Sequence, residues 1–149
     1  MPASDAVVLP ETASPSKYRI TLQPDLHNFT FTGEASVDLQ VLEATSTIVL
    51  NSVDLEISSA TLHAGGTALS SRSVTIDKDG ETATLDFGDT VQPGEARLEL
   101  AFTGELNDKL VGFYRSEYTG PDGETRYLAT TQFEPTDARR AFPCWDEPA

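Results

Sequence analysis

The chain has 149 residues, of which 38% are hydrophobic, and this is enough for the core of one ordinary domain. A formal net charge of −14 argues against binding to nucleic acid or to an anionic membrane. The single cysteine cannot form an internal disulfide, residues 1–5 lack the features of a secretory signal, and no apolar run is long enough to span a membrane. These features predict a cytoplasmic protein.

The first part of the chain is predicted to form a tail followed by two strands. Residues 1–17 contain three prolines among small polar residues and are interpreted as an extended tail. Apolar and polar residues alternate over 18–23, which predicts a half-buried strand that the next proline ends. Alternation over 29–42 predicts the longest strand, and Gly33 within it indicates either a bulge or a close backbone approach.

The remaining strands are expected at short spacing. A strand over 53–62 changes phase at residues 58–59, which indicates a bulge because one extra residue moves each later side chain to the other face. Asp79-Gly80 between two alternating runs is a hairpin signal. The other expected elements are a buried strand at 47–50, turns at 65–66 and 92–94, strands at 73–77, 82–87 and 96–102, and a hairpin of 110–118 with 125–133.

Together these patterns predict an all-β fold of about eight or nine strands, arranged as an antiparallel β-sandwich or as a strongly curved sheet. The domain is expected to cover residues 18–149. Pro135 is expected to end the last strand, and Thr136 or Asp137 to cap a short helical turn that runs through Arg140 or Phe142.

Acidic residues gather at two of the predicted turns and could be imagined as calcium ligands. The sequence lacks the twelve-residue loop order that makes such a site convincing, so ordinary solvated turn residues are the preferred interpretation. No metal site is therefore predicted for Asp77, Asp79, Glu81, Asp86 and Asp89.

The segment from Thr130 to Pro148 has the most specific residue order in the chain. Gln132 and Glu134 are two positions apart on a predicted strand, so their side chains should project from the same face. A carboxylate makes strong charge-assisted bonds to an ammonium group, and an amide adds donors and an acceptor. The pair could bind the free amino end of a peptide, or it could be two solvated polar residues at a strand end, which the spacing alone favours.

Other residues of this segment are expected to have structural roles. Cys144 has no histidine near it in the sequence, so a packed thiol is expected rather than a nucleophile. Trp145 is expected to be a packing anchor. Arg139 and Arg140 could bind an anion, but ion pairs are expected instead with one or more of Asp137, Asp146 and Glu147.

The order Thr-Gln-Phe-Glu-Pro-Thr-Asp-Ala-Arg-Arg-Ala-Phe-Pro-Cys-Trp-Asp-Glu-Pro over 131–148 resembles a segment of the M1 family of zinc aminopeptidases, of the puromycin-sensitive type. Weaker likeness extends over most of the chain. The resemblance implies an antiparallel, saddle-like first domain. It also implies that Gln132 and Glu134 line the first substrate pocket, where Glu134 binds the α-amino group of the peptide, and that 142–148 is structural.

The family's catalytic residues are missing from this sequence. Catalysis in the family needs a His-Glu-x-x-His helix, a further Glu ligand, a Gly-x-Met-x-Asn loop and a Tyr, whereas this chain has only His27 and His63, far apart and neither followed by Glu. The resemblance therefore implies an amino-terminal domain, incomplete at its carboxyl end, with no catalytic residue or cofactor of its own. Zinc is expected in the full-length enzyme, and the expected partners are a peptide N-terminus and the missing catalytic domain. A non-catalytic interaction module or an isolated fragment remains the alternative.

Overall fold

A computed structural model describes residues 9–134 and 137–146 of the chain. In this described part, ten strands and one short 3-10 helix form the all-β fold that the alternating sequence predicts. The strands are β1 (Ala13–Asp25), β2 (Thr30–Val41), β3 (Thr45–Asn51), β4 (Leu55–Ala64), β5 (Thr67–Ser70), β6 (Ser73–Asp77), β7 (Thr82–Val91), β8 (Gly94–Glu105), β9 (Gly112–Thr119) and β10 (Thr125–Gln132), and the 3-10 helix η1 covers Ala138–Arg140.

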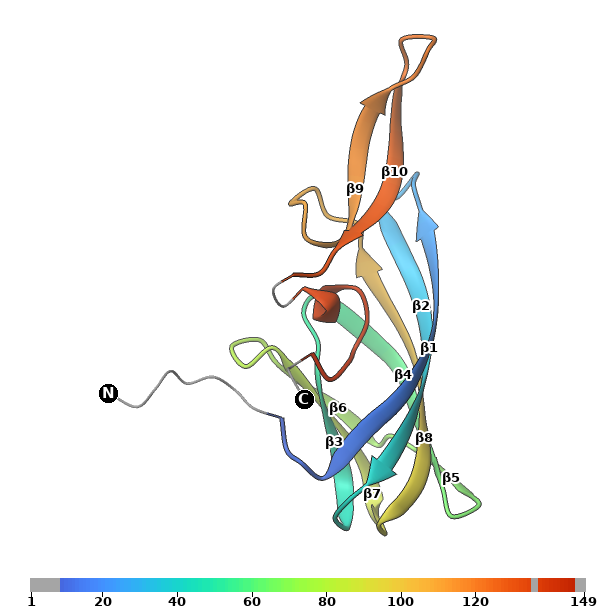
Figure 1. Cartoon of the computed structure of the whole chain (residues 1–149), viewed down its shortest axis with the longest axis vertical. Helices are drawn as coiled ribbons and strands as arrows, with labels where there is room; N and C mark the ends of the chain where they lie inside the picture. The colour runs from blue at the N-terminus through green and yellow to red at the C-terminus, as the bar shows by residue number, and fades with distance from the viewer. Residues whose placement is uncertain (1–8, 135–136, 147–149) are drawn as a thin grey trace, which may run out of the picture.

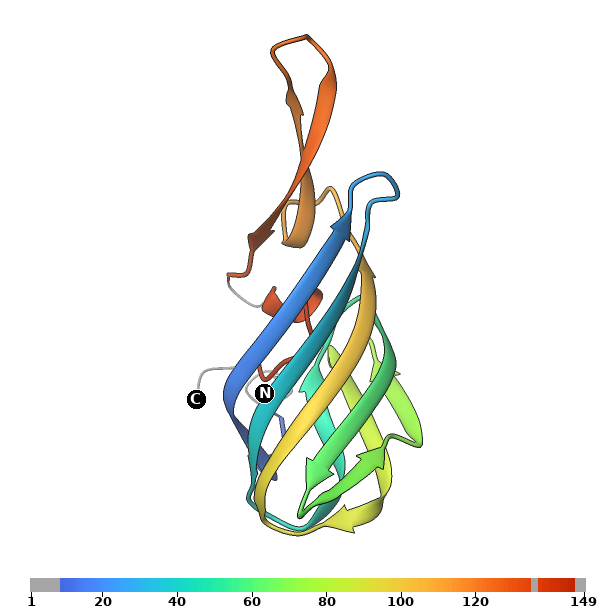
Figure 2. The ribbon, with the colours of Figure 1, turned by 90° about the vertical axis from the view of Figure 1, so that its right-hand side faces the viewer.

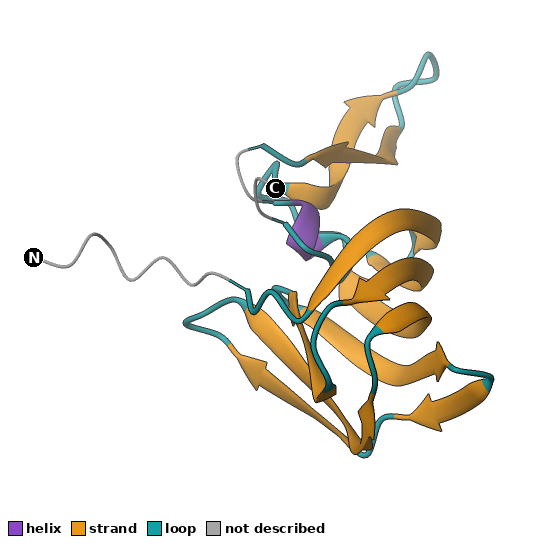
Figure 3. Cartoon of the chain, turned by 60° about the horizontal axis from the view of Figure 1, so that its bottom comes forward, coloured by secondary structure: helices purple, strands orange, loops and turns teal. Residues whose placement is uncertain are grey.

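The strands form three antiparallel sheets. The largest has the order β1-β2-β8-β4-β5, and its strands lie side by side in a strongly curved surface (Figure 2). A smaller sheet, β3-β7-β6, forms a second layer beneath it (Figure 3), and β9 pairs with β10 as a separate hairpin. The expected all-β, antiparallel fold is confirmed, with ten strands in the described residues rather than eight or nine.

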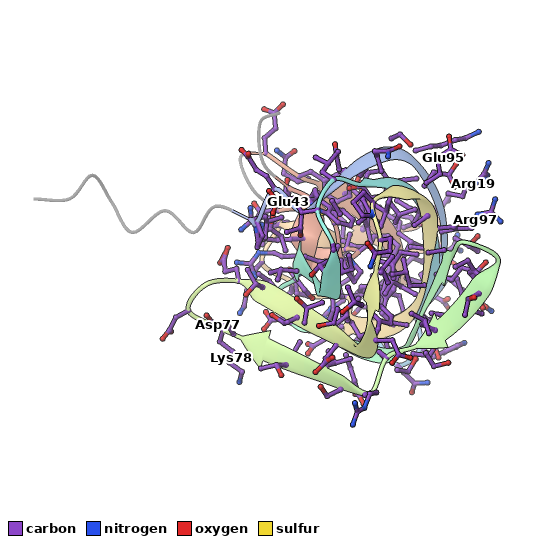
Figure 4. All side chains as sticks on the ribbon, turned by 90° about the horizontal axis from the view of Figure 1, so that it is seen from below. Arg19, Glu43, Asp77, Lys78, Glu95 and Arg97 are labelled. Atoms are coloured by element: carbon purple, nitrogen blue, oxygen red, sulfur yellow. The ribbon has the colours of Figure 1, made fainter. Side chains whose placement is uncertain are left out.

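The core lies between the two layers because each strand turns its apolar face inward and its polar face to solvent. Both sheets contribute side chains that are at most 1% exposed: Phe31, Val37, Leu98 and Phe102 from the large sheet, and Ile48, Leu50 and Leu85 from the small one. Seen from below, the side chains fill the space between the sheets, while Arg19 and Arg97 point outward (Figure 4).

Two glycines of the large sheet make room for two aromatic rings. Gly33 of β2 lies opposite Phe102 of β8, and Phe31 of β2 lies opposite Gly104 of β8. A Cβ atom on either glycine would collide with the ring across from it. The close approach that Gly33 suggested is therefore present, and the pairing of β2 with both neighbours continues through Gly33 without a bulge.

Strand β1 is longer than its sequence predicts. It begins at Ala13 rather than at Tyr18 and continues through Pro24, so residues 13–17 belong to the sheet and not to a tail. The prolines are tolerated because β1 is an edge strand, where one side of the backbone needs no partner, and the register shifts between Pro15 and Lys17. Residues 1–8 of the expected tail lie outside the described residues.

Two other features of the large sheet concern β4. The register of β4 against β8 shifts between Ile57 and Ser59, which confirms the bulge expected from the change of phase. Strand β5 pairs with the end of β4 over only four residues, Thr67–Ser70, and was not expected from the sequence pattern. None of the described residues forms a helix that is long and apolar enough to cross a membrane.

The β9–β10 hairpin projects from one end of the sandwich (Figure 1). Aromatic contacts anchor it at two levels: at the base, the rings of Phe31 and Phe113 meet edge-to-face at 5.0 Å, and farther out those of Phe29 and Tyr127 meet at 4.9 Å. The opposite face leaves Leu128 43% exposed. The hairpin therefore brings the end of β10 back to the sandwich at Gln132, and the two candidate binding residues lie there.

Candidate functional site

Gln132 and Glu134 both lie at the exposed end of β10. The last ladder pair of the hairpin joins Gln132 to Gly112, so Gln132 is the final strand residue and Glu134 stands in the turn that follows. The strand thus ends one residue earlier than expected, and Pro135 lies outside the described residues. Both side chains are exposed, and neither forms a hydrogen bond or ion pair with any residue that the structure describes.

Phe133 anchors the backbone between these two residues. Its ring is half-buried and packs edge-to-face on Phe142, with the ring centroids 5.9 Å apart. Its carbonyl oxygen accepts a hydrogen bond of 2.7 Å from the Asp137 N–H, which closes the turn containing Glu134. Gln132 and Glu134 therefore flank Phe133, whose ring and carbonyl group are both fixed by contacts within the domain.

The expected helical turn is present as η1, but its cap differs from the prediction. The Asp137 carboxylate makes no capping bond, and it accepts a bond of 2.8 Å from Arg140 Nε instead. Thr136, the other expected cap, lies outside the described residues.

Arg139 ties the chain after η1 to the small sheet. Its Nε donates to Asp146 Oδ2 at 3.0 Å and one terminal nitrogen donates to Glu81 Oε1 at 3.0 Å, while the Arg139 side chain is only 11% exposed. The backbone adds a bond of 3.0 Å from the Val53 N–H to the Arg139 oxygen. The expected ion pairing of Arg139 with Asp146 is confirmed, whereas Glu147 lies outside the described residues.

Cys144 and Trp145 are packed as expected. The thiol is 3% exposed, and burial raises the pKa of Cys144 to about 12, so it is held as a neutral and inert group. Backbone bonds between Cys144 and Asn51 attach this segment to the end of β3. The backbone N–H of Trp145 donates to the Tyr18 hydroxyl at 3.1 Å, and the Trp145 indole packs against the core.

Comparison with known proteins identifies the family. A model described as the peptidase M1 N-terminal domain matches residues 14–149.

The chain belongs to this family of M1 N-terminal domains.

Curated relatives of this M1 N-terminal domain are aminopeptidases. It is 47% identical over 143 residues to Aminopeptidase 2 of Candida albicans, a match that covers 95% of this chain and 15% of the relative. It is 45% identical over 145 residues to Aminopeptidase M1 of Arabidopsis thaliana, covering 95% and 16%, and 42% identical over 141 residues to the puromycin-sensitive aminopeptidase of Caenorhabditis elegans, covering 94% and 15%. The chain thus spans about a sixth of the length of these relatives.

The acidic turns of the M1 N-terminal domain carry ordinary turn chemistry. Asp77 Oδ1 accepts a bond of 3.1 Å from the Gly80 N–H, and Asp86 Oδ1 accepts one of 2.8 Å from the Gly88 N–H. Within the described ranges, no group of three His, Cys, Asp or Glu residues is placed to hold a metal ion.

Two residues beside the candidate site were not singled out from the sequence. Gly112 lies across the ladder from Gln132, and the Arg140 side chain packs directly over Gly112. Asp54, from the loop before β4, lies 3.5 Å from Arg140. These contacts join residues that are far apart in the chain, so local patterns give no signal for them.

Proposed function

We propose that this chain is the N-terminal domain of a zinc aminopeptidase in which Gln132 and Glu134 bind the free α-amino group of a peptide. The observation that carries the proposal is the pair of exposed polar side chains, without a partner among the described residues, on either side of the anchored Phe133. The names of the relatives support the reaction class, and the family-like residue order supports the role of the pair.

The chemistry of the pair suits an ammonium group. The Glu134 carboxylate supplies a charge-assisted acceptor, and the Gln132 amide supplies a second acceptor that helps to orient the amino group. A peptide without a free amino group would leave Glu134 desolvated and unpaired, which limits cleavage to the amino end. Zinc, when bound in a downstream catalytic domain, would supply an activated water.

The location of the enzyme belongs to this proposal. We infer a cytoplasmic protein from the single, buried cysteine, which forms no disulfide within the chain. Substrate peptides and the downstream catalytic domain are the proposed partners.

The test is the kinetics of the full-length enzyme carrying Glu134→Ala, with Glu124→Ala at the exposed hairpin tip as the matched control. Loss of the ammonium contact is expected to raise KM for an aminoacyl reporter by about 10- to 100-fold and to lower kcat where the register of the substrate is lost. Glu124→Ala is expected to leave both parameters unchanged. Equal kinetics for Glu134→Ala and the unmodified enzyme would remove the role assigned to Glu134.

A further inference from the structure

We propose that the packing of Arg140 on Gly112, called the Gly112–Arg140 contact below, sets the position of Gln132 relative to Glu134. Gly112 and Arg140 are then positioning residues for the binding of the amino group. This inference rests on the proposed function of the pair. Neither residue is placed in contact with the substrate. Both act through the backbone of the segment that presents Gln132 and Glu134.

The first step is the contact between Gly112 and Arg140. Gly112 is buried, has φ of +70°, and is the ladder partner of Gln132. A Cβ atom at position 112 would lie 2.6 Å from Arg140 Cβ and 3.3 Å from Arg140 Cδ. The Arg140 stem therefore occupies the space that any other residue at 112 would need, directly across the ladder from Gln132.

The second step is that this contact closes a loop. The chain leaves the hairpin at Gln132, passes Glu134, and returns at Arg140 to pack on the residue opposite Gln132. The bond from the Asp137 N–H to the Phe133 oxygen braces the loop from within. The backbone of Gln132 and that of Phe133, next to Glu134, are thus each fixed by a described contact.

The third step concerns the charge of Arg140. Its guanidinium is held by Asp137 at 2.8 Å and by Asp54 at 3.5 Å, and Arg140 forms no ion pair with Glu134 in the described structure. Asp54 has φ of +57°, a conformation that Asp adopts more often than most residues other than glycine, and its side chain is 80% exposed. Because two carboxylates engage the cation, Glu134 is left available for a ligand ammonium.

The experiment compares Gly112→Ala with Gly123→Ala in the full-length enzyme. Gly123 lies at the tip of the same hairpin with φ of +79°, but a Cβ atom there would meet nothing within 4 Å, so it controls for backbone strain alone. The readout is amine selectivity, defined as the ratio of Ki for 4-methylpentanoyl p-nitroanilide, which lacks the amino group, to KM for leucine p-nitroanilide. Gly112→Ala is expected to lower this ratio about tenfold or more, since small displacements of binding groups are costly, whereas Gly123→Ala should not change it. An equal ratio for the two variants would contradict the positioning role of the Gly112–Arg140 contact.

A second pair of variants keeps the test decisive if Gly112→Ala does not fold. Arg140→Ala removes the stem beyond Cβ and the charge, whereas Arg140→Met keeps an unbranched stem without the charge. We expect Arg140→Ala to lower the amine selectivity and Arg140→Met to preserve most of it. A loss as large in Arg140→Met as in Arg140→Ala would contradict positioning by packing.

Gln132→Ala and Glu134→Ala separate the two levels of the proposal. If they abolish amine selectivity while the Gly112 and Arg140 variants retain it, the positioning role of the Gly112–Arg140 contact is wrong and the proposed function stands. If none of the variants changes the selectivity, the proposed function is wrong, and the positioning role that rests on it is wrong as well.

Discussion

Arg139 shows how a single side chain holds the end of the chain in place. Its guanidinium is nearly buried between Asp146 and Glu81, whereas Arg126 forms a pair of similar length, 2.9 Å, with Asp122 on the exposed hairpin. Bond length is therefore matched between the two sites, whereas burial and the number of partners differ, because Arg139 bonds two carboxylates and Arg126 one. Burial decides their contributions because a desolvated charge that loses its partner is left uncompensated.

Arg139→Met should lower the free energy of unfolding by about 2–3 kcal/mol, since Asp146 would lose its partner in a poorly solvated site. Arg126→Met should cost less than about 1 kcal/mol, as expected for an exposed pair. Denaturant unfolding of the two variants measures the difference. Equal losses for both variants would show that burial of the Arg139 network has no special weight.

The half-buried Tyr18 hydroxyl and the buried Cys144 thiol, both neutral at pH 7, make the stability of the fold sensitive to alkaline pH. Burial raises the pKa of Tyr18 from 10.0 to about 12, and burial also raises the pKa of Cys144 from 9.0 to about 12. Both folded-state pKa values lie above the unfolded values, so the native state favours the protonated forms. Their contribution to stability is fully present below pH 9 and is lost as the pH rises toward about 12.

The free energy of unfolding should accordingly fall between pH 9 and pH 12, and the fall should be smaller in Tyr18→Phe. That variant should also be less stable at pH 7, by about 1 kcal/mol, because the Trp145 N–H loses its acceptor. Urea unfolding at pH 7, 9 and 11 measures both effects. A pH dependence that is identical in Tyr18→Phe and the unmodified chain would rule out the Tyr18 contribution.

Elements differ in how firmly they are attached. The five-stranded and three-stranded sheets form most of one core, and the β9–β10 hairpin joins it through Phe113 and Ala129. The outer part of the hairpin depends on the contact of Tyr127 with Phe29. A two-stranded hairpin alone is marginally stable in water. The hairpin should therefore open before the sandwich does.

Native-state hydrogen exchange should show faster exchange for the amides of β10 than for those of β2 and β8, because local opening exposes them without global unfolding. Tyr127→Ala removes the ring that packs on Phe29 and should speed exchange in β9 and β10 only. Slower exchange in β10 than in β8 would contradict this order of stability.

The elements also show what local sequence can predict. The Asp79-Gly80 hairpin and the bulge near Ser59 were predicted because turn chemistry and side-chain alternation are local properties. The early start of β1 was missed because Pro15 argues against a strand unless the strand lies at an edge, and sheet order is a property of the whole fold. Strand β5 was missed because four residues carry too little periodicity.

The candidate site divides in the same way. Gln132 and Glu134 were predicted as a binding pair from residue order, since the family-like segment is continuous in the sequence, and their binding role stays a prediction. The packing of Arg140 on Gly112 could not be found, because it depends on how the hairpin returns to η1. The backbone conformation of Asp54 gives no sequence signal either, because φ above zero is usually signalled by glycine.

At the scale of the whole molecule, the chain holds the proposed binding pair but not the zinc-site sequence that catalysis in the family needs. Its 149 residues contain no His-Glu-x-x-His order, and His27 and His63 lie on different elements. The purified chain is expected to bind no stoichiometric zinc and to hydrolyse no aminoacyl reporter. Elemental analysis and a fluorogenic assay measure this; about one zinc per chain, or turnover above the buffer rate, would contradict it.

The reciprocal glycine–phenylalanine pairs have a consequence for how the large sheet assembles. If β2 slid by two residues against β8 in one direction, Phe31 would face Phe102 and two rings would compete for one space. If it slid the other way, Gly33 would face Gly104 and leave a hole in the layer. Only the observed alignment places each ring over a glycine. These four residues therefore favour a single register of β2 against β8 when the sheet forms.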